Sequence, residues 1–219
     1  MSDIVPTDTQ AAAIKRIVEW YKGGRKTPQV FYLAGYAGTG KSTIAKFVTD
    51  ELAKSFDFTV MPAAYTGKAA NVLRQKGNEF ARTFHSGMYI PIPQKNGSVE
   101  FHLSPNAPFA MADLILGDEC SMINRRMGMD TESFGKKILV MGDPGQIPPI
   151  DGYGYWTNRK PDVFLTEVHR QALDSPILRL ATMARESKKL PRGNWKDNDG
   201  NIIRSVEYNE STKYDYTTA

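Results

Sequence analysis

The chain has 219 residues, of which 41% are hydrophobic and 24% are charged, and its formal net charge is +4. This composition excludes a fibrous or intrinsically disordered chain, and the mild positive charge permits nucleic-acid binding without establishing it. The lone cysteine, Cys120, excludes an internal disulfide, and there is neither a signal peptide at the start nor an apolar run of about 18 residues. We expect a protein with no membrane contact in the cytoplasm, or in the host cytoplasm if a phage encodes it.

Helical and strand patterns alternate in the first half of the chain. A helix is predicted where apolar residues recur at helical spacing, and a buried strand where a short apolar run is bounded by turn residues. Thr7 or Asp8 can cap the first helix. The expected elements are a helix over residues 7–22, a strand over 30–34, a helix over 42–54, a strand over 58–62 and a helix over 67–75.

The second half begins with an interruption of this alternation. Residues 87–108 contain four prolines and a Gly-Ser turn, which predict an irregular insertion, with a hairpin as one form of it. Beyond it we expect strands over residues 114–116, 137–142 and 163–165 and a helix over residues 176–185. The alternation predicts an α/β fold, a mostly parallel sheet with helices on both faces, in a domain of residues 1–187. Residues 188–219 form either a polar tail or the start of a second domain.

The segment Gly35–Ser42 matches the phosphate-loop pattern G-x-x-x-x-G-K-[ST] between a predicted strand and a predicted helix. Glycines let backbone N–H groups converge on a phosphate, and the helix N-terminus favours an anion. Lys41 would reach the β- and γ-phosphates, and Ser42 would coordinate Mg²⁺. The cofactors expected are therefore ATP and Mg²⁺. The binding residues would be Gly35, Gly38, Thr39, Gly40, Lys41, Ser42 and Thr43.

Asp118 and Glu119 follow the predicted strand over residues 114–116. Ligands of an open α/β sheet bind at the carboxyl ends of its strands, so these carboxylates would face the phosphates. Asp118 is placed to hold Mg²⁺ through water, and Glu119 to polarise the attacking water. Alone, such a pair is more often a solvated loop, but the phosphate loop upstream favours the catalytic interpretation.

Three further segments resemble motifs of superfamily 1 helicases. Residues 142–149, Gly-Asp-Pro-Gly-Gln-Ile-Pro-Pro, are similar to motif III, and the resemblance implies that Gln146 senses the γ-phosphate. The triplet His-Arg-Gln at residues 169–171 is similar to motif IV, which implies that Arg170 neutralises charge on the γ-phosphate. Residues 6–10 resemble the Q motif, in which Gln10 would read the edge of adenine.

Two other segments resemble the parts of these helicases that line the path of single-stranded DNA. Residues 63–70 are similar to motif Ia, and residues 81–86 to the T-x-H segment that follows it. The DNA-binding residues expected from this resemblance are Thr66, Gly67, Lys68, Thr83, Phe84 and His85. For Phe84 the alternative of a core aromatic stays open. The order and spacing of all these motifs over residues 3–187 resemble the RecD/Dda branch, whose members are RecA-like phosphate-loop enzymes that move 5′ to 3′.

The resemblance implies the first motor domain of an ATP-dependent DNA helicase acting on single-stranded DNA. The second RecA-like domain of such motors carries motifs V and VI, and residues 188–219 match neither. We therefore expect slow turnover from this chain alone, with a second polypeptide as one source of the other domain. The alternatives are a phosphate-loop NTPase unrelated to DNA and a non-catalytic module that binds nucleotide or single strands.

Overall fold

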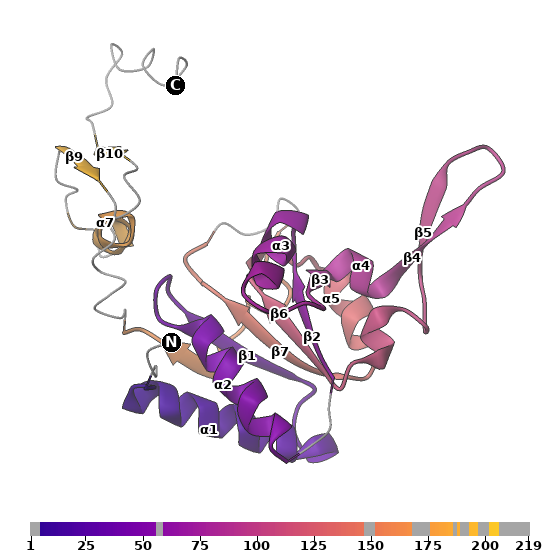
Figure 1. The fold of residues 1–219 in the computed structure, drawn as a ribbon, viewed down its shortest axis with the longest axis horizontal. Coiled ribbons are helices and arrows are strands. Elements are labelled where there is room, and N and C mark those ends of the chain that lie inside the picture. The colour runs from indigo at the N-terminus through magenta and orange to yellow at the C-terminus, as the bar shows by residue number, and fades with distance from the viewer. Residues whose placement is uncertain are drawn as a thin grey trace, which may run out of the picture. The chain divides into compact units, whose positions relative to one another are not determined.

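The computed structural model describes residues 5–55, 59–146, 152–167, 176–185, 188, 193–196 and 202–205. The chain divides into two compact units, Met1–Thr166 and Glu167–Ala219. The first unit carries every element that surrounds the phosphate loop, so its architecture decides where the candidate site lies (Figure 1).

A six-stranded sheet runs through the first unit, with the strand order β3-β2-β6-β7-β1-β8. All of its pairings are parallel. The strands are β1 (Val30–Gly35), β2 (Val60–Ala64), β3 (Arg82–Thr83), β6 (Leu114–Asp118), β7 (Lys137–Gly142) and β8 (Val163–Leu165). Parallel strands are joined by connections that cross over the sheet, and the helices in these connections cover both of its faces, as the alternating pattern predicts.

Each strand sends alternate side chains to opposite faces of the sheet. On one face Leu33 and Leu139 belong to a core shared with α1 (Asp8–Lys22) and α2 (Lys41–Ala53), which lie together along the sheet in Figure 1. On the other face Tyr32 and Val140 join a second core. Its further elements are α4 (Phe84–Met88), the 3-10 helices Pro108–Met111 and Cys120–Met122, and α5 (Arg125–Glu132). Helix α3 (Gly67–Gln75) packs beside β2 and β3 over a small cluster around Ala70 and Leu73.

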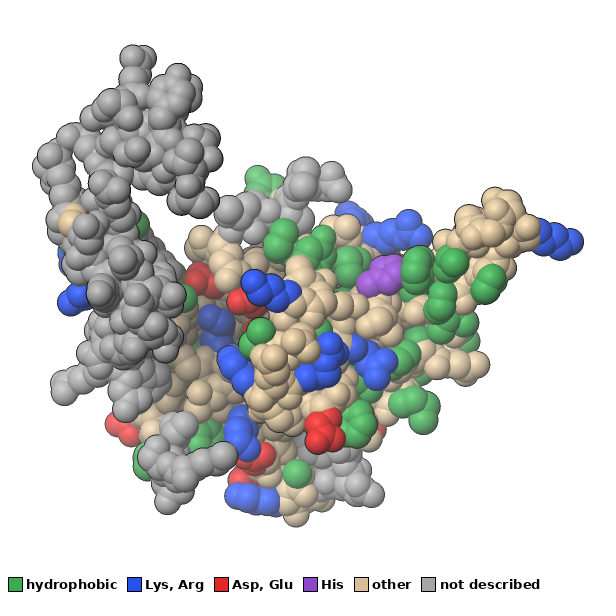
Figure 2. Space-filling view, turned by 45° about the horizontal axis from the view of Figure 1, so that its top comes forward, with side chains coloured by type: hydrophobic (Ala, Val, Ile, Leu, Met, Phe, Trp, Pro, Cys, Tyr) green, Lys and Arg blue, Asp and Glu red, His purple; other side chains and the backbone are tan. Residues whose placement is uncertain are grey.

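The insertion over residues 87–108 contains an antiparallel hairpin of β4 (Tyr89–Pro93) and β5 (Val99–Leu103). It carries large apolar side chains that remain partly in water, of which Phe101 is 54% and Val99 51% exposed. Figure 2 shows these apolar side chains gathered on the projecting hairpin. The regular pairing shows that the prolines do not prevent strand formation, because Pro91 and Pro93 lie on an edge strand of a two-stranded sheet.

The second unit contains α7 (Pro176–Arg185) and an antiparallel pair, β9 (Gly193–Lys196) with β10 (Ile202–Ser205). The helix over residues 176–185 is therefore confirmed, and part of the polar tail is strand. The compact units divide after Thr166. The expected domain boundary after residue 187 stays a prediction. Among the described residues, no helix combines the length and apolar character needed to cross a membrane.

Candidate nucleotide-binding site

The carboxyl ends of the parallel strands bring the sequence motifs to one edge of the sheet. The phosphate loop follows β1, Thr66 follows β2, and the carboxylates of Asp118 and Glu119 stand at the end of β6. Asp143 and Gln146 follow β7, which pairs directly with β1. Segments more than 100 residues apart in the chain therefore meet around the phosphate loop.

The shape of the phosphate loop depends on its glycines. Gly38 and Gly40 have φ angles of 80° and 84°, a region that other residues rarely enter. A Cβ on Gly35 would lie 2.6 Å from Thr39 Oγ1, and that hydroxyl donates a hydrogen bond of 2.8 Å to the Tyr36 carbonyl. The loop therefore closes tightly only with these residue types, as the motif predicts.

Helix α2 differs from its neighbours at its N-terminus. A side chain caps each of the other α-helices described in the first unit: Thr7 caps α1, Thr66 caps α3, Thr83 caps α4 and Asn124 caps α5. The N-cap of α2 is Gly40, which has no side chain to offer. No side chain therefore caps the first turn of α2, and a phosphate is a ligand that a helix N-terminus of this kind favours.

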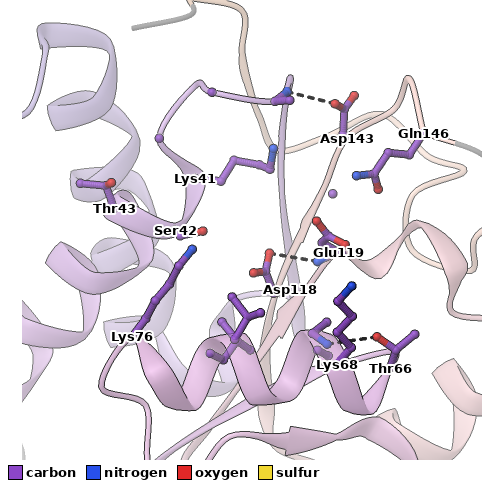
Figure 3. Close-up of a pocket in the computed structure, with 18 residues that line it drawn as sticks. Lys41, Ser42, Thr43, Thr66, Lys68, Lys76, Asp118, Glu119, Asp143 and Gln146 are labelled. Carbon is purple, nitrogen blue, oxygen red and sulfur yellow. Dashed lines mark hydrogen bonds between the residues drawn. The ribbon is translucent and has the colours of Figure 1, made fainter. Parts of the chain in front are cut away.

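Lys41 and Ser42 open α2 and face the same cavity as the loop (Figure 3). The Lys41 ammonium donates hydrogen bonds to the carbonyls of Gly35, at 2.7 Å, and Tyr36, at 3.1 Å. These bonds hold the charge against the loop, where a triphosphate would lie. Thr43, Gly38 and Gly40 line the cavity as well.

Asp118 and Glu119 form the opposite side of this cavity. Burial raises the pKa of the Asp118 carboxyl, whereas the Glu119 N–H and the charges of Lys41 and Lys76 lower it. A cation beside Asp118 would favour its ionised form further. Glu119 has a φ angle of 50°, and among the described residues it is the one non-glycine residue with positive φ. Such a conformation stores strain, a feature that tends to cluster at functional sites.

The segment after β7 is tied to its surroundings at two points. The buried Asp143 carboxylate accepts hydrogen bonds from the N–H of Ala37, at 3.0 Å, and of Gly145, at 2.8 Å. The Ser121 hydroxyl donates a 2.7 Å hydrogen bond to the Gln146 side-chain oxygen. Sequence reasoning missed both supports. Asp143 lies within a recognised motif and Ser121 two residues after the acidic pair, but nothing in their spacing shows which hydrogen-bond partner each one takes.

The cavity has a volume of about 640 Å³, and its lining includes Lys41, Ser42, Asp118, Glu119 and Gln146. Its donor set fits a nucleoside triphosphate with a divalent cation. The glycine loop and the N-terminus of α2, which no side chain caps, suit the phosphates, and a hydroxyl and a carboxylate suit Mg²⁺. Among the described residues, no group of three or more His, Cys, Asp and Glu could hold a metal. Mg²⁺ usually takes its remaining ligands from water and from the phosphates of the nucleotide.

The structure gives Gln10 a different position from the one expected. Its side chain is 4% exposed, accepts a hydrogen bond from the Thr7 N–H at 3.1 Å, and donates one to the Thr39 carbonyl at 3.1 Å. The expectation that this amide reads the adenine edge stays a prediction, and here the amide makes these two backbone hydrogen bonds. A Thr-x-x-Gln pattern is also a capping box, and Thr7 and Gln10 form one here. Each side chain accepts a hydrogen bond from the backbone N–H of the other residue at the start of α1. Gln10 ties α1 to the phosphate loop instead.

The residues expected to bind DNA separate into two groups. Thr66 and Thr83 are helix caps, Gly67 begins α3, and the exposed His85 ring contacts the rings of Tyr89 and Phe101. Phe84 is fully buried against Phe109 and Trp156, so the expectation that it contacts DNA is wrong and its alternative as a core aromatic holds. The hydrophobic cost of exposing such a ring favours the core.

Lys68 lines the nucleotide cavity, and so does Lys76, a residue that the motifs did not single out (Figure 3). Thr66 lines it too, and together with Glu119 and Gln146 it also borders a neighbouring cavity of about 340 Å³ that includes Tyr65. The N-terminal part of α3 therefore borders both cavities. Arg170, with His169 and Gln171, lies outside the described residues, and so do the prolines of residues 148–149.

Comparison with known proteins agrees with this geometry. A family model described as AAA domain matches residues 6–206. The ATP-dependent RecD2 DNA helicase of Deinococcus radiodurans is 36% identical over 156 residues, which are 68% of this chain and 21% of that protein. The ATP-dependent DNA helicase dda of Enterobacteria phage T4 is 29% identical over 167 residues, which are 70% of this chain and 37% of that protein.

Solved structures show the same fold at lower identity. A Pif1 helicase from Bacteroides aligns with a TM-score of 0.54 at 20% identity, over 86% of this chain and 48% of the other. A Pif1 helicase from Candida albicans aligns with a TM-score of 0.54 at 18% identity, over 84% and 44%. The α/β, RecA-like fold and the resemblance to the RecD/Dda type are thereby confirmed. The chain belongs to the AAA domain family, and its sequence is similar to those of the RecD2 and dda helicases.

Proposed function

We propose that this chain is the ATP-binding and ATP-hydrolysing motor domain of a DNA helicase that moves 5′ to 3′ on single-stranded DNA. The observation that carries the proposal is the convergence of Lys41, Ser42, Asp118, Glu119 and Gln146 on one cavity beside the uncapped N-terminus of α2. These residues come from three separate strand ends, and each supplies the chemical group that phosphoryl transfer to water requires.

Different side chains of the chain are proposed to bind the phosphates, hold the metal ion and activate the attacking water. The loop N–H groups and the Lys41 ammonium hold the phosphates, and the Ser42 hydroxyl and Asp118 carboxylate would hold Mg²⁺. When bound, this ion neutralises charge on the phosphate oxygens. Glu119 accepts a proton from the attacking water, and the Gln146 amide donates to the γ-phosphate. Arg170 would add a planar, permanently charged donor.

The DNA path is proposed to run over the strand ends beyond the nucleotide cavity. Thr66 and Gly67 open α3, and Thr83 opens α4, so both helices direct their N-termini to this side. The exposed ring of His85, which contacts the rings of Tyr89 and Phe101, offers an aromatic surface on which a base can stack. Binding of single-stranded DNA here would depend strongly on salt, because phosphate contacts dominate it.

Full turnover is proposed to need a second RecA-like domain. The chain spans 21% of the RecD2 relative and 37% of the dda relative, so those proteins contain much more than this unit. In such motors the nucleotide lies between two domains, and the second one brings a further arginine to the γ-phosphate. That domain could follow in a longer polypeptide or come from a partner chain.

The test is an ATPase assay of the 219-residue chain with and without single-stranded DNA. We expect measurable ATP binding, slow hydrolysis and little stimulation by DNA, because only one wall of the cleft is present. Adding a second RecA-like domain in trans should raise the DNA-stimulated rate by about 10³-fold or more. Rapid, DNA-stimulated hydrolysis by the chain alone would contradict the need for that domain. Rapid hydrolysis indifferent to DNA would instead indicate an NTPase unrelated to DNA.

A further inference from the structure

We propose that Ser121 is a positioning residue for Gln146. Its hydroxyl holds the side-chain oxygen of Gln146, so that the amide nitrogen faces the nucleotide cavity and donates to the γ-phosphate. This inference rests on the proposed function and adds to it a residue that none of the recognised helicase motifs assigns.

The contact itself joins two motifs across the site. The Ser121 hydroxyl donates to Gln146 Oε1 at 2.7 Å, although the two residues are 25 positions apart. Ser121 is 5% exposed, whereas the Gln146 side chain stands at the exposed edge of the cavity. In Figure 3 the Gln146 amide nitrogen points towards the side of the cavity that carries Lys41, and its oxygen points away from that side.

The orientation of this amide decides the sign of its interaction with an anion. A carboxamide presents two N–H donors on one end and two lone pairs on the other. With the nitrogen towards the cavity it donates to a phosphate oxygen, and with the oxygen there it would repel the same atom. A hydroxyl can donate to the oxygen or accept from the nitrogen, but only donation leaves both N–H groups of Gln146 for the phosphate.

Ser121 is itself fixed in place by the surrounding backbone. Glu119, with its φ angle of 50°, turns the chain out of β6 into the 3-10 helix Cys120–Met122. A Cβ on Gly154 would lie 2.5 Å from the Ser121 carbonyl oxygen, so the loop over residues 152–160 packs tightly against that backbone. The Tyr155 N–H then donates to the Ile123 carbonyl at 2.8 Å. The hydroxyl therefore has little freedom to follow Gln146 elsewhere.

The main chain next to Gln146 is held independently of its side chain. Asp143 accepts the N–H groups of Gly145 and of Ala37 in the phosphate loop. Removing the Ser121 hydroxyl should thus leave the backbone of the segment in position and free only the Gln146 amide. This separation makes Ser121→Ala a specific probe of the orientation of the amide.

The test compares the affinities of ATP and ADP, each with Mg²⁺, by calorimetry on the full chain. ADP lacks the γ-phosphate, so a residue that acts through Gln146 should change ATP affinity alone. We expect Ser121→Ala to weaken ATP binding about three- to tenfold, the size of one hydrogen bond, and to leave ADP binding unchanged. Gln146→Ala should show the same pattern. The double variant should bind ATP no more weakly than Gln146→Ala, because the hydroxyl then has no amide to orient.

The matched control is Ser104→Ala. Ser104 is 6% exposed and its hydroxyl accepts a hydrogen bond from the Asn106 N–H, away from the nucleotide cavity. It should leave both affinities unchanged, and thermal melts of all variants show whether each remains folded. Equal losses of ATP and ADP binding in Ser121→Ala, no loss at all, or additive losses in the double variant would each overturn the inference alone. A wild-type chain that binds neither nucleotide would contradict the proposed function itself.

Discussion

The phosphate loop follows one strand of the parallel sheet and the segment Arg82–Tyr89 begins with another, but the two differ in what fixes their side chains. In the loop, positive φ angles at Gly38 and Gly40 and a tight contact beside Gly35 dictate the backbone, and the backbone supplies the ligand groups. In Arg82–Tyr89 the backbone forms an ordinary short strand and helix. There the tertiary packing decides which side chain is buried and which one is exposed.

This difference explains why the two regions were not equally predictable. Local sequence specifies a phosphate loop, because the residue types at fixed spacing are themselves the binding geometry. The alternation of Phe84 and His85 carries no such information. Phe84 enters the core beside Trp156, a residue 72 positions later, and His85 is left at the surface.

The largest expected effect is on the rate of ATP hydrolysis and concerns Glu119, beside the phosphate loop. Glu119→Gln keeps the shape and hydrogen bonding of the side chain but removes the base. In an assay with measurable turnover, such as one complemented by a second RecA-like domain, the rate should fall about 10²- to 10⁴-fold while ATP affinity is retained. A variant that hydrolyses ATP at the wild-type rate would show that Glu119 does not activate the water.

The next effect tests the other region. Phe84→Ala removes a fully buried ring and should lower the free energy of unfolding by about 3–5 kcal/mol, measured by denaturant titration. His85→Ala, its exposed neighbour, should cost about 1 kcal/mol or less. In the milder Phe84→Leu variant the affinity for single-stranded DNA should match the wild type, whereas His85→Ala should weaken it. Unchanged stability with weakened DNA binding in Phe84→Ala would restore Phe84 as a DNA contact.

The same reasoning applies to the fold. The hydrophobic patterns predicted α3, β7, β8 and α7 over their full ranges, β1 to within one residue and β6 in part, because each shows a clear helical period or a short apolar run. They missed the two-residue strand β3 and helices α4 and α5, which have too few residues for a clear period. In the site, the cavity-lining side chains of the phosphate loop and the acidic pair were predicted. The supports from Gln10, Ser121 and Asp143 were not, because each bond joins segments that meet only in the folded chain.

A smaller expected effect, on ATP affinity, tests whether Lys68 acts at the nucleotide cavity or on the DNA path. Its side chain lines the nucleotide cavity, although its motif resembles a DNA-contacting one. Lys68→Ala should weaken ATP binding about two- to threefold, and less at high salt, as expected for an exposed charge. Lys95→Ala, at the turn of the β4–β5 hairpin, is the control and should have no effect. Loss of DNA affinity with unchanged ATP affinity in Lys68→Ala would assign this residue to the DNA path instead.

The most direct measurement is a calorimetric titration of ATP with Mg²⁺ into the wild-type chain and into Lys41→Ala. Lys41 places its ammonium on the loop carbonyls of Gly35 and Tyr36, inside the cavity that also holds Asp118 and Glu119. Removing this charge should lower ATP affinity at least about tenfold, roughly 1.4 kcal/mol, and a thermal melt should show that the variant stays folded despite the loss of the two hydrogen bonds to the loop. Equal ATP affinity in the two proteins would contradict the assignment of this cavity as the nucleotide site.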